Sequence, residues 1–502
     1  MEAVTETQKR QSPTVIALIL LFKLLSGPLC LLIVYSIEVE GMVHGSKIAL
    51  GTLAWMVAWW ILQPAPWGIT ALLPLVIFPL TGTLGITDTT SLYGQRVFFW
   101  IMGVTLLALA VIKHGLAKRF ALAFLTLPGV GDSTGRLLFV FMLATACVSM
   151  FVSDGSAVAI MIPIGLSIHA YIVTLSRQNA SGNEAPRLRA FIALGTLYAA
   201  VSGGIATMIG MPHSAVAMAQ LEALTGSSIG WFSWMMVGVP IFAVLLVCNY
   251  FLLRFFFKPE IGIIPGGRDF LLREQRKLGK MTSGEKSVLF IFLFMAMLFI
   301  LPPLLPNILG EENAFSLWLS NAISIWVVPP IVLLLLFTVP SNLKEREFVL
   351  NWKEASARIP WEILLMVTSA VAVVQTLAAF GFTDLVAQNI AKASHSAVGL
   401  PYLTGIATAI STNLMSGVAA AALLTAVMVP VAEQVGFNPA AITIMVPATA
   451  MGIIFPWAGA TVGTAFAIGQ IELRDLIRIG ILAEIIMIAV AGTFCLIFAP
   501  FL

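Results

Sequence analysis

Charged residues are scarce in this 502-residue sequence. Asp, Glu, Lys and Arg together make up 10% of it, whereas hydrophobic residues make up 59%. An ordinary soluble domain carries about 25% charged residues. So little charge, combined with long apolar runs, excludes an ordinary soluble protein and predicts an all-α polytopic membrane protein.

Several other features are missing. The cysteines lie in apolar runs without metal-ligand spacing, so we expect no metal centre and no disulfides; they are Cys30, Cys147, Cys248 and Cys495. No glycine-rich nucleotide loop lies between a strand and a helix, and no nucleophile–base pair is recognisable. An ATP-driven motor, a cofactor and an enzymatic activity are therefore not expected. Met1 to Pro13 lacks the cleavage site of a signal peptide, so the apolar run after it is expected to remain as a first span.

Basic residues lie between particular apolar runs. Lys9 and Arg10 precede the first run, Thr14–Tyr35, and a basic polar loop covers 258–286. Because cytoplasmic loops carry an excess of Lys and Arg, we expect a multi-pass cell-membrane protein with its N-terminus and this loop in the cytoplasm. We interpret the charge of the loop as a solvated face and not as a nucleic-acid site.

Polar residues interrupt the apolar stretch Phe151–Ile164 at Ser153-Asp154-Gly155. A turn inside hydrocarbon leaves backbone groups unpaired unless it lines a cavity or a ligand, so such a break predicts a binding site. A similar break, Ser416-Gly417-Val418, interrupts a later apolar run. Two interrupted segments in corresponding halves are the best sequence indication of where a transporter binds its substrate.

The same order of elements occurs twice along the chain. The first repeat, 1–257, is expected to hold a surface helix at 113–127, a re-entrant hairpin at 136–174 and a broken helix at 191–214. After the loop 258–286, the second repeat, 287–502, is expected to hold a surface helix at 380–393, a hairpin at 400–431 and a broken helix at 440–464. An odd number of elements separates corresponding parts, so the repeats should be inverted, with hairpin tips meeting near the midplane.

Seven blocks in this order resemble the divalent anion/sodium symporter family, whose members carry dicarboxylates, citrate or sulfate. The blocks cover nearly the whole chain: FFWIMGVTLLALAVIKHGLAKRFAL (98–122), SDGSAVAIMIPI (153–164), GGIATMIGMPHS (203–214), LGKMTSGEKSV (278–288), IPWEILLMVTSAVAVV (359–374), TNLMSGVAAAALL (412–424) and the tail 456–484. The resemblance implies an elevator-type homodimer in the lipid bilayer. Its scaffold domain would hold the dimer, and its transport domain would carry both hairpins across the membrane.

The family has a Ser-Asn-Thr triplet at each hairpin tip and Thr-Pro-Pro-type breaks in its broken helices. The breaks correspond here to Met211-Pro212-His213 and to Gly459-Ala460-Thr461. The resemblance implies that Ser153 and Ser416 donate hydrogen bonds to a substrate carboxylate, with a weaker role for Thr461. The substrate-binding set that it implies is Ser153, Asp154, Gly155, Pro212, His213, Ser416, Gly417, Val418 and Thr461.

Only the serines of the two triplets are present in this chain. Asp154 and Gly417 stand at the asparagine positions, and Gly155 and Val418 at the threonine positions. In the family these positions surround sodium, which needs several oxygen ligands. We therefore expect sodium coupling to be weakened or absent, and exchange of one C4 or C5 dicarboxylate, of the malate, succinate or 2-oxoglutarate class, for another.

Two residues at the breaks have alternative interpretations. His213 is either a neutral histidine hydrogen-bonded near the break or a positive charge that balances the dianion. Asp154 either caps the second helix of its hairpin, pairs with a cation such as His213 or a metal ion, or is protonated and acts as a coupling site. Asn413 is expected to orient the second tip, and Glu484 is expected near the end of a span with a polar partner.

Alternative functions are also open at this stage. A sodium- or proton-coupled dicarboxylate symporter has the same fold and differs in energetics. An anion channel would conduct without a counter-substrate, with a flux far above carrier turnover. A membrane enzyme ranks lowest because no catalytic set is recognisable.

Overall fold

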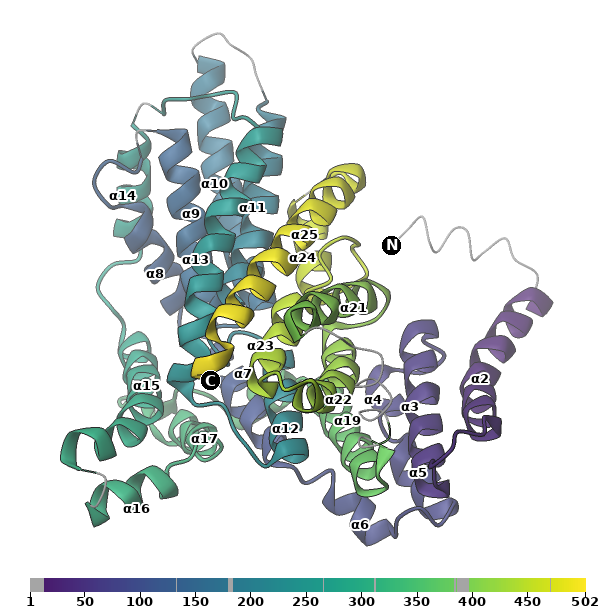
Figure 1. Ribbon diagram of the computed structural model, residues 1–502. Coiled ribbons are helices and arrows are strands. Elements are labelled where there is room, and N and C mark those ends of the chain that lie inside the picture. Colours follow the sequence, from purple (N-terminus) through teal and green to yellow (C-terminus); the bar gives the residue numbers. More distant parts are fainter. Residues whose placement is uncertain are drawn as a thin grey trace. The chain divides into compact units, whose positions relative to one another are not determined.

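The computed structural model describes residues 13–131, 133–178, 184–264, 266–310, 313–382, 385, 397–469 and 471–502. Helices dominate these residues (Figure 1), and ten of them are long and apolar enough to cross a membrane. Within the described part of the chain, strands are limited to a short antiparallel pair, β1 (Pro340–Asn342) and β2 (Glu347–Phe348). The predicted all-α polytopic membrane fold is confirmed.

The chain divides into two compact units, which we describe separately. The first unit comprises residues 1–95 and 361–394. Its helices are α2 (Pro13–Ser36), α3 (His44–Leu62), α4 (Trp67–Thr70), α5 (Leu73–Leu80), α6 (Ile86–Ser91) and α19 (Trp361–Ala379). Helix α3 packs against both α2 and α19, which joins the two segments of this unit. The surface helix predicted at 380–393 falls largely outside the described residues.

The second unit comprises residues 96–360 and 395–502. Its first segment holds α7 (Arg96–Lys113), α8 (Leu116–Leu125), α9 (Thr134–Ser149), α10 (Asp154–Gln178), α11 (Pro186–Ile205), α12 (Pro212–Thr225), α13 (Trp231–Phe256), α14 (Gly267–Lys277), α15 (Ser283–Leu309), α16 (Ala314–Ala322), α17 (Val328–Thr338) and α18 (Trp352–Ala357). Its second segment holds η1 (Ala397–Gly399), α21 (Leu400–Leu414), α22 (Gly417–Val435), α23 (Pro439–Thr449), α24 (Ala460–Gly469), α25 (Leu473–Phe498) and η2 (Ala499–Phe501). All elements of the predicted site belong to this unit.

Two helical hairpins lie in the second unit, α9–α10 and α21–α22. The first arms have 16 and 15 residues, which at 1.5 Å per residue makes each about 24 Å long or slightly less. A hydrocarbon core is about 30 Å thick, so these arms are too short to cross it. In each hairpin a few residues join the short first arm to a longer second arm, and α10 and α22 are long and apolar enough to cross a membrane. The re-entrant form of the two hairpins stays a prediction.

Two other helices are interrupted within the same unit. Helix α11 ends at Ile205 and α12 begins at Pro212, whereas α23 ends at Thr449 and α24 begins at Ala460. Small residues allow close packing beside the first interruption, because a Cβ atom on Gly203 would lie 2.2 Å from the Ala146 carbonyl oxygen. Pro212 occupies the first turn of α12, where its missing N–H group costs no helical bond.

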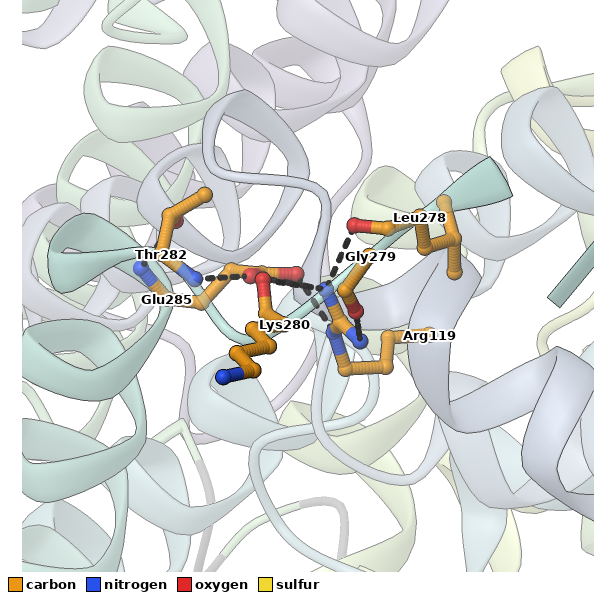
Figure 2. Close-up of polar contacts among 6 residues, drawn as sticks. All are labelled: Arg119, Leu278, Gly279, Lys280, Thr282 and Glu285. Atoms are coloured by element: carbon orange, nitrogen blue, oxygen red, sulfur yellow. Dashed lines mark hydrogen bonds and ion pairs between the residues drawn. The ribbon is translucent and has the colours of Figure 1, made fainter. Parts of the chain in front are cut away.

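Helix α8 occupies most of the predicted surface helix 113–127 and is tied to the segment before α15. Figure 2 shows the Arg119 guanidinium at the centre of this link. Its Nε lies 2.7 Å from Glu285 Oε1, and its terminal nitrogens donate to the carbonyl oxygens of Leu278 and Gly279. Glu285 also accepts the Thr282 N–H in a capping box at the start of α15. One arginine thus holds a loop and a helix start in place.

We expect Arg119→Gln to destabilise the protein by about 2–3 kcal/mol, because the carboxylate of Glu285, whose side chain is 5% exposed, would lose its cationic partner. Thermal unfolding in detergent measures the effect. Lys113→Gln is the matched control, since it removes one positive charge from the exposed Lys113–Glu354 pair, where the ammonium lowers the pKa of Glu354. Exposed pairs contribute up to about 1 kcal/mol. Equal effects of the two substitutions would contradict a structural role for Arg119.

Candidate functional site

The tip of the first hairpin has a strained backbone. Ser153 adopts a φ of 25°, which is unfavourable for a residue with a side chain. Its hydroxyl donates to Ser156 Oγ over 3.0 Å. Asp154 begins α10, and its Oδ1 accepts the N–H of Gly155 over 2.8 Å. Strain of this kind is typical of functional sites, where the surrounding structure enforces the conformation.

The second tip has a conventional helix start. Ser416 is the N-cap of α22, and its hydroxyl accepts the N–H of Ala419 over 3.2 Å. Gly417 packs so closely against α23 that a Cβ atom would lie 2.3 Å from the Ala450 carbonyl oxygen. Val418 follows in the first turn, partly exposed. The two tips therefore resemble each other in sequence but not in local geometry.

The first interruption connects the two tips. At its start, the Thr207 hydroxyl donates to the carbonyl oxygen of Met150, just before the first tip. At its end, His213 Nδ1 lies 3.6 Å from where a Gly417 Cβ would be, at the second tip. The six steps from Thr207 to His213 reach at most about 20 Å. The tips consequently lie on neighbouring sides of one short segment.

The second interruption connects the tips in the opposite order. It starts at Ala450, whose carbonyl oxygen contacts Gly417. It ends at Thr461, whose hydroxyl interacts with the Asp154 carboxyl group and lies 3.3 Å from where a Gly155 Cβ would be. Each tip thus lies beside the start of one interruption and the end of the other. Helix packing agrees, since α12 packs against α22 and α24 packs against α10.

This crosswise arrangement pairs four helix N-termini, with α24 beside α10 at the first tip and α12 beside α22 at the second. The N-terminus of a helix carries a partial positive charge and unpaired N–H groups. Such ends bind anions without any cationic side chain. Each tip is therefore suited to a small anion even though few charged residues line it.

His213 lies at the second tip and not at the first. It is 6% exposed and hydrogen-bonds to the backbone of Pro447, while its Nε2 has no partner among the described residues. No bond to Asp154 is seen within the described part of the chain. The interpretation of His213 as a histidine held near the break fits this geometry, and its second ring nitrogen remains available to a ligand.

Asp154 has partners that fit its interpretation as a helix cap. Its carboxyl group accepts a backbone N–H at the start of α10 and interacts with the Thr461 hydroxyl. The proposed pairing with His213 is not observed, because the histidine contacts the other tip. These partners occupy the Asp154 carboxyl group with two backbone N–H groups and one hydroxyl.

Asn413 joins the second hairpin to the second interruption. Its side-chain nitrogen donates to the Ala409 carbonyl over 2.9 Å, and its oxygen accepts the Ile454 N–H over 3.2 Å. The side chain is 6% exposed. Asn413 therefore links the end of α21 to the second interruption, and its role in orienting Ser416 stays a prediction.

Glu484 lies elsewhere than the sequence suggested. It is in the middle of α25, not near its end, and is 4% exposed. Its carboxyl group is buried beside the Asn413 amide and the Ile453 backbone, and neither oxygen completes a hydrogen bond of normal geometry. The expected position near a span end was wrong, because α25 runs from Leu473 to Phe498 and Glu484 lies well inside it, whereas the expected polar partner is present in Asn413. An acidic residue in the middle of an apolar helix was the signal that could have identified it as a buried group near the site.

Comparison with known proteins adds family information to this geometry. The family described as the sodium:sulfate symporter transmembrane region matches residues 20–502. A protein of Staphylococcus saprophyticus subsp. saprophyticus named sodium-dependent dicarboxylate transporter SdcS is 27% identical over 475 residues, covering 93% of this chain and 89% of that protein. A protein of the same name from Staphylococcus aureus is also 27% identical, over 474 residues, covering 93% of this chain and 88% of the relative.

Two solved structures share the fold at low sequence identity. One is MtrF of Neisseria gonorrhoeae, whose published description assigns it to a class of antimetabolite efflux pumps. It has a TM-score of 0.55 at 14% identity and covers 84% of each chain. The other is the YdaH transporter of Alcanivorax borkumensis, with a TM-score of 0.52 at 14% identity, covering 91% of this chain and 99% of that one. Both likenesses concern the fold alone.

Proposed function

Because the chain belongs to the sodium:sulfate symporter transmembrane family, a family of transporters and not of enzymes, we propose that it moves a dicarboxylate dianion across the membrane together with sodium. The observation that carries the proposal is the crosswise arrangement of the two tips and the two interruptions. The pair of helix N-termini and the hydroxyl groups at each tip support an anion site. The substrate class and the coupling ion are taken from the staphylococcal relatives.

The dianion would be held by polar groups of small size. The hydroxyls of Ser153 and Ser416 can rotate toward a carboxylate, and the Thr461 hydroxyl lies beside the first tip. Helix N-termini supply partial positive charge. His213 Nε2 adds one further polar atom at the second tip. These groups suit the two carboxylates of a C4 or C5 dicarboxylate.

The staphylococcal relatives are named sodium-dependent transporters, which favours sodium coupling over the exchange that we expected from the sequence. The expectation rested on the loss of amide and hydroxyl ligands at both tips. The first tip, however, retains an oxygen donor in Asp154, which carries two carboxyl oxygens in place of one amide oxygen. Hard cations such as sodium take oxygen ligands, including backbone carbonyls. A bound cation at this tip would also reduce the repulsion between Asp154 and the dianion.

Exchange is the second candidate function, and the residue composition of the second tip favours it. Gly417 and Val418 offer no side-chain oxygen there. A carrier without enough cation sites needs a bound dianion for each crossing, so an internal dianion must leave when an external one enters. We further propose an elevator mechanism in a homodimer, in the cell membrane with the N-terminus in the cytoplasm.

Uptake by proteoliposomes tests the proposal. We expect radiolabelled succinate to accumulate in empty vesicles under an inward sodium gradient, and uptake to fall at least about tenfold when potassium replaces sodium. Unlabelled malate and 2-oxoglutarate should compete, whereas a monocarboxylate should not. Uptake that ignores sodium and requires dicarboxylate inside the vesicles would establish exchange instead. Transport of neither type would remove dicarboxylates as the substrate class.

A further inference from the structure

A large cavity lies at the base of the first hairpin, away from its tip. It has a volume of about 640 Å³ and is bounded by the loop before α9, the start of α9 and the end of α13. Three cationic side chains line it, Arg136, Arg254 and Lys258. No role in substrate binding at the tips accounts for this cluster.

The positive charge of this cavity is not balanced by its described lining, in which no acidic residue occurs. The nearby carboxylate of Glu260 is committed elsewhere, because it accepts the backbone N–H groups of Arg187 and Leu188 at the start of α11. Asp132 belongs to the same loop in sequence and lies outside the described residues. The start of α11 is thus covered by a carboxylate. At the start of α9, the Thr134 N–H donates to the Gly262 carbonyl, but the described lining supplies no carboxylate.

Arg254 is held directly over the start of α9. Its Nη1 donates to the Tyr250 hydroxyl over 2.9 Å, and that hydroxyl donates to the Gly135 carbonyl over 3.0 Å. Gly135 allows the approach, since a Cβ atom there would lie 2.9 Å from Nη1. A guanidinium beside the positive end of a helix is unfavourable unless an anion lies between them. Arg254 is exposed, so it is open to a soluble or lipid anion, and an anion seated between the guanidinium and the helix start would interact favourably with both.

The start of α9 also presents one buried hydroxyl group without a partner among the described residues. Ser133 is the N-cap but makes no capping bond with its side chain. The hydroxyl of Thr134 has no partner among the described residues, although Thr134 lines the cavity and is only 1% exposed. A buried hydroxyl without a partner costs about 1–3 kcal/mol, so such groups are rarely left empty. Thr134 thus indicates a polar ligand independently of the three cations.

We propose that this cavity binds a phosphate-bearing anion, with its phosphate between Arg254, Arg136 and the start of α9. Phosphate oxygens suit guanidinium groups, helix N-termini and a hydroxyl donor together. The remaining wall is apolar, with Leu138, Phe139, Val140 and Phe191, and can accept hydrocarbon. Basic pockets between membrane helices bind lipid headgroups. The same phosphate chemistry occurs in an anionic phospholipid and in free phosphate.

The test uses the purified full-length protein, delipidated in a neutral detergent. Thermal unfolding is recorded with phosphatidylglycerol, phosphatidylcholine, inorganic phosphate or succinate. We expect phosphatidylglycerol to raise the unfolding temperature and phosphatidylcholine to leave it unchanged. Succinate binds at the tips, so any shift that it causes should be unaffected by substitutions in this cavity. A shift with phosphatidylglycerol alone identifies a lipid, and an equal shift with inorganic phosphate identifies a soluble anion. Absence of a shift with both phosphatidylglycerol and inorganic phosphate would overturn the proposal.

Variants locate the site. The double variant Arg136→Gln/Arg254→Gln should weaken binding of the stabilising anion about tenfold or more. The control variant Arg273→Gln/Arg276→Gln removes the same amount of charge from α14, outside the cavity. It should have little effect on anion binding. Equal losses in both pairs would mean that only net charge matters and would refute the site.

Thr134→Val provides a second measurement that does not depend on the arginine pair folding. It keeps the shape of the side chain and removes the unpartnered hydroxyl. We expect anion binding to weaken about threefold or more, while the ligand-free protein unfolds at the same or a higher temperature. Unchanged anion binding in this variant would show that the hydroxyl has no ligand and would contradict the proposal.

Discussion

Gly417→Ala is expected to abolish transport while leaving most of the protein folded. A Cβ atom at this position would lie 2.3 Å from the Ala450 carbonyl oxygen, and backbone atoms cannot move aside as a flexible side chain would. The second tip and the second interruption would have to separate. Overpacking of this kind costs about 1–3 kcal/mol, which the fold can tolerate. The binding region requires positions within about 0.5 Å, so it should fail first.

Gly399→Ala is the matched control for that substitution. Gly399 precedes the same hairpin, and a Cβ atom there would meet no atom within 4 Å. We expect its uptake and unfolding temperature to equal those of the unmodified protein. Uptake is measured in proteoliposomes at equal reconstituted protein, and folding by thermal unfolding in detergent. Normal uptake by Gly417→Ala would show that close contact between the second tip and Ala450 is not needed for transport.

Asp154→Ala is expected to remove sodium-dependent uptake, with a loss of at least about tenfold at saturating succinate. The substitution deletes the one side-chain oxygen donor that the first tip retains beyond its serine, and it deletes the cap of α10. Cap removal alone costs about 1 kcal/mol, so a larger functional than structural effect separates the two roles.

Asp154→Asn refines this result. It keeps one oxygen and the hydrogen bond to the start of α10 but removes the charge. We expect partial uptake with a raised sodium requirement, measured as the sodium concentration giving half-maximal uptake. Glu345→Ala, which deletes an exposed carboxyl group in the β1–β2 turn, is the control and should behave as the unmodified protein. A sodium dependence identical in both Asp154 variants and the control would assign Asp154 a purely structural role.

Much of the architecture was predictable because membrane helices are specified locally. Long apolar runs must form helices in a bilayer, and polar interruptions inside them are costly enough to be meaningful. Ser153 and Ser416 were recognisable for this reason, as were the short first arms α9 and α21, whereas the second arms α10 and α22 are longer than the sequence suggested. Glu484 was misplaced because its burial comes from Ile453 and Asn413, which belong to other segments, and no local pattern in α25 reveals such contacts.

The amino-acid sequence by itself determined that this protein lies in a membrane, that its chain turns back at two polar tips and that two of its helices are interrupted. Only the tertiary structure decided which interruption meets which tip, that His213 faces Gly417 while Thr461 faces Asp154, and that three cations surround the start of α9. The reason is that backbone hydrogen bonding in hydrocarbon is satisfied within each segment, so sequence specifies the segments. Contacts between segments far apart in the chain depend on packing, which no single segment contains.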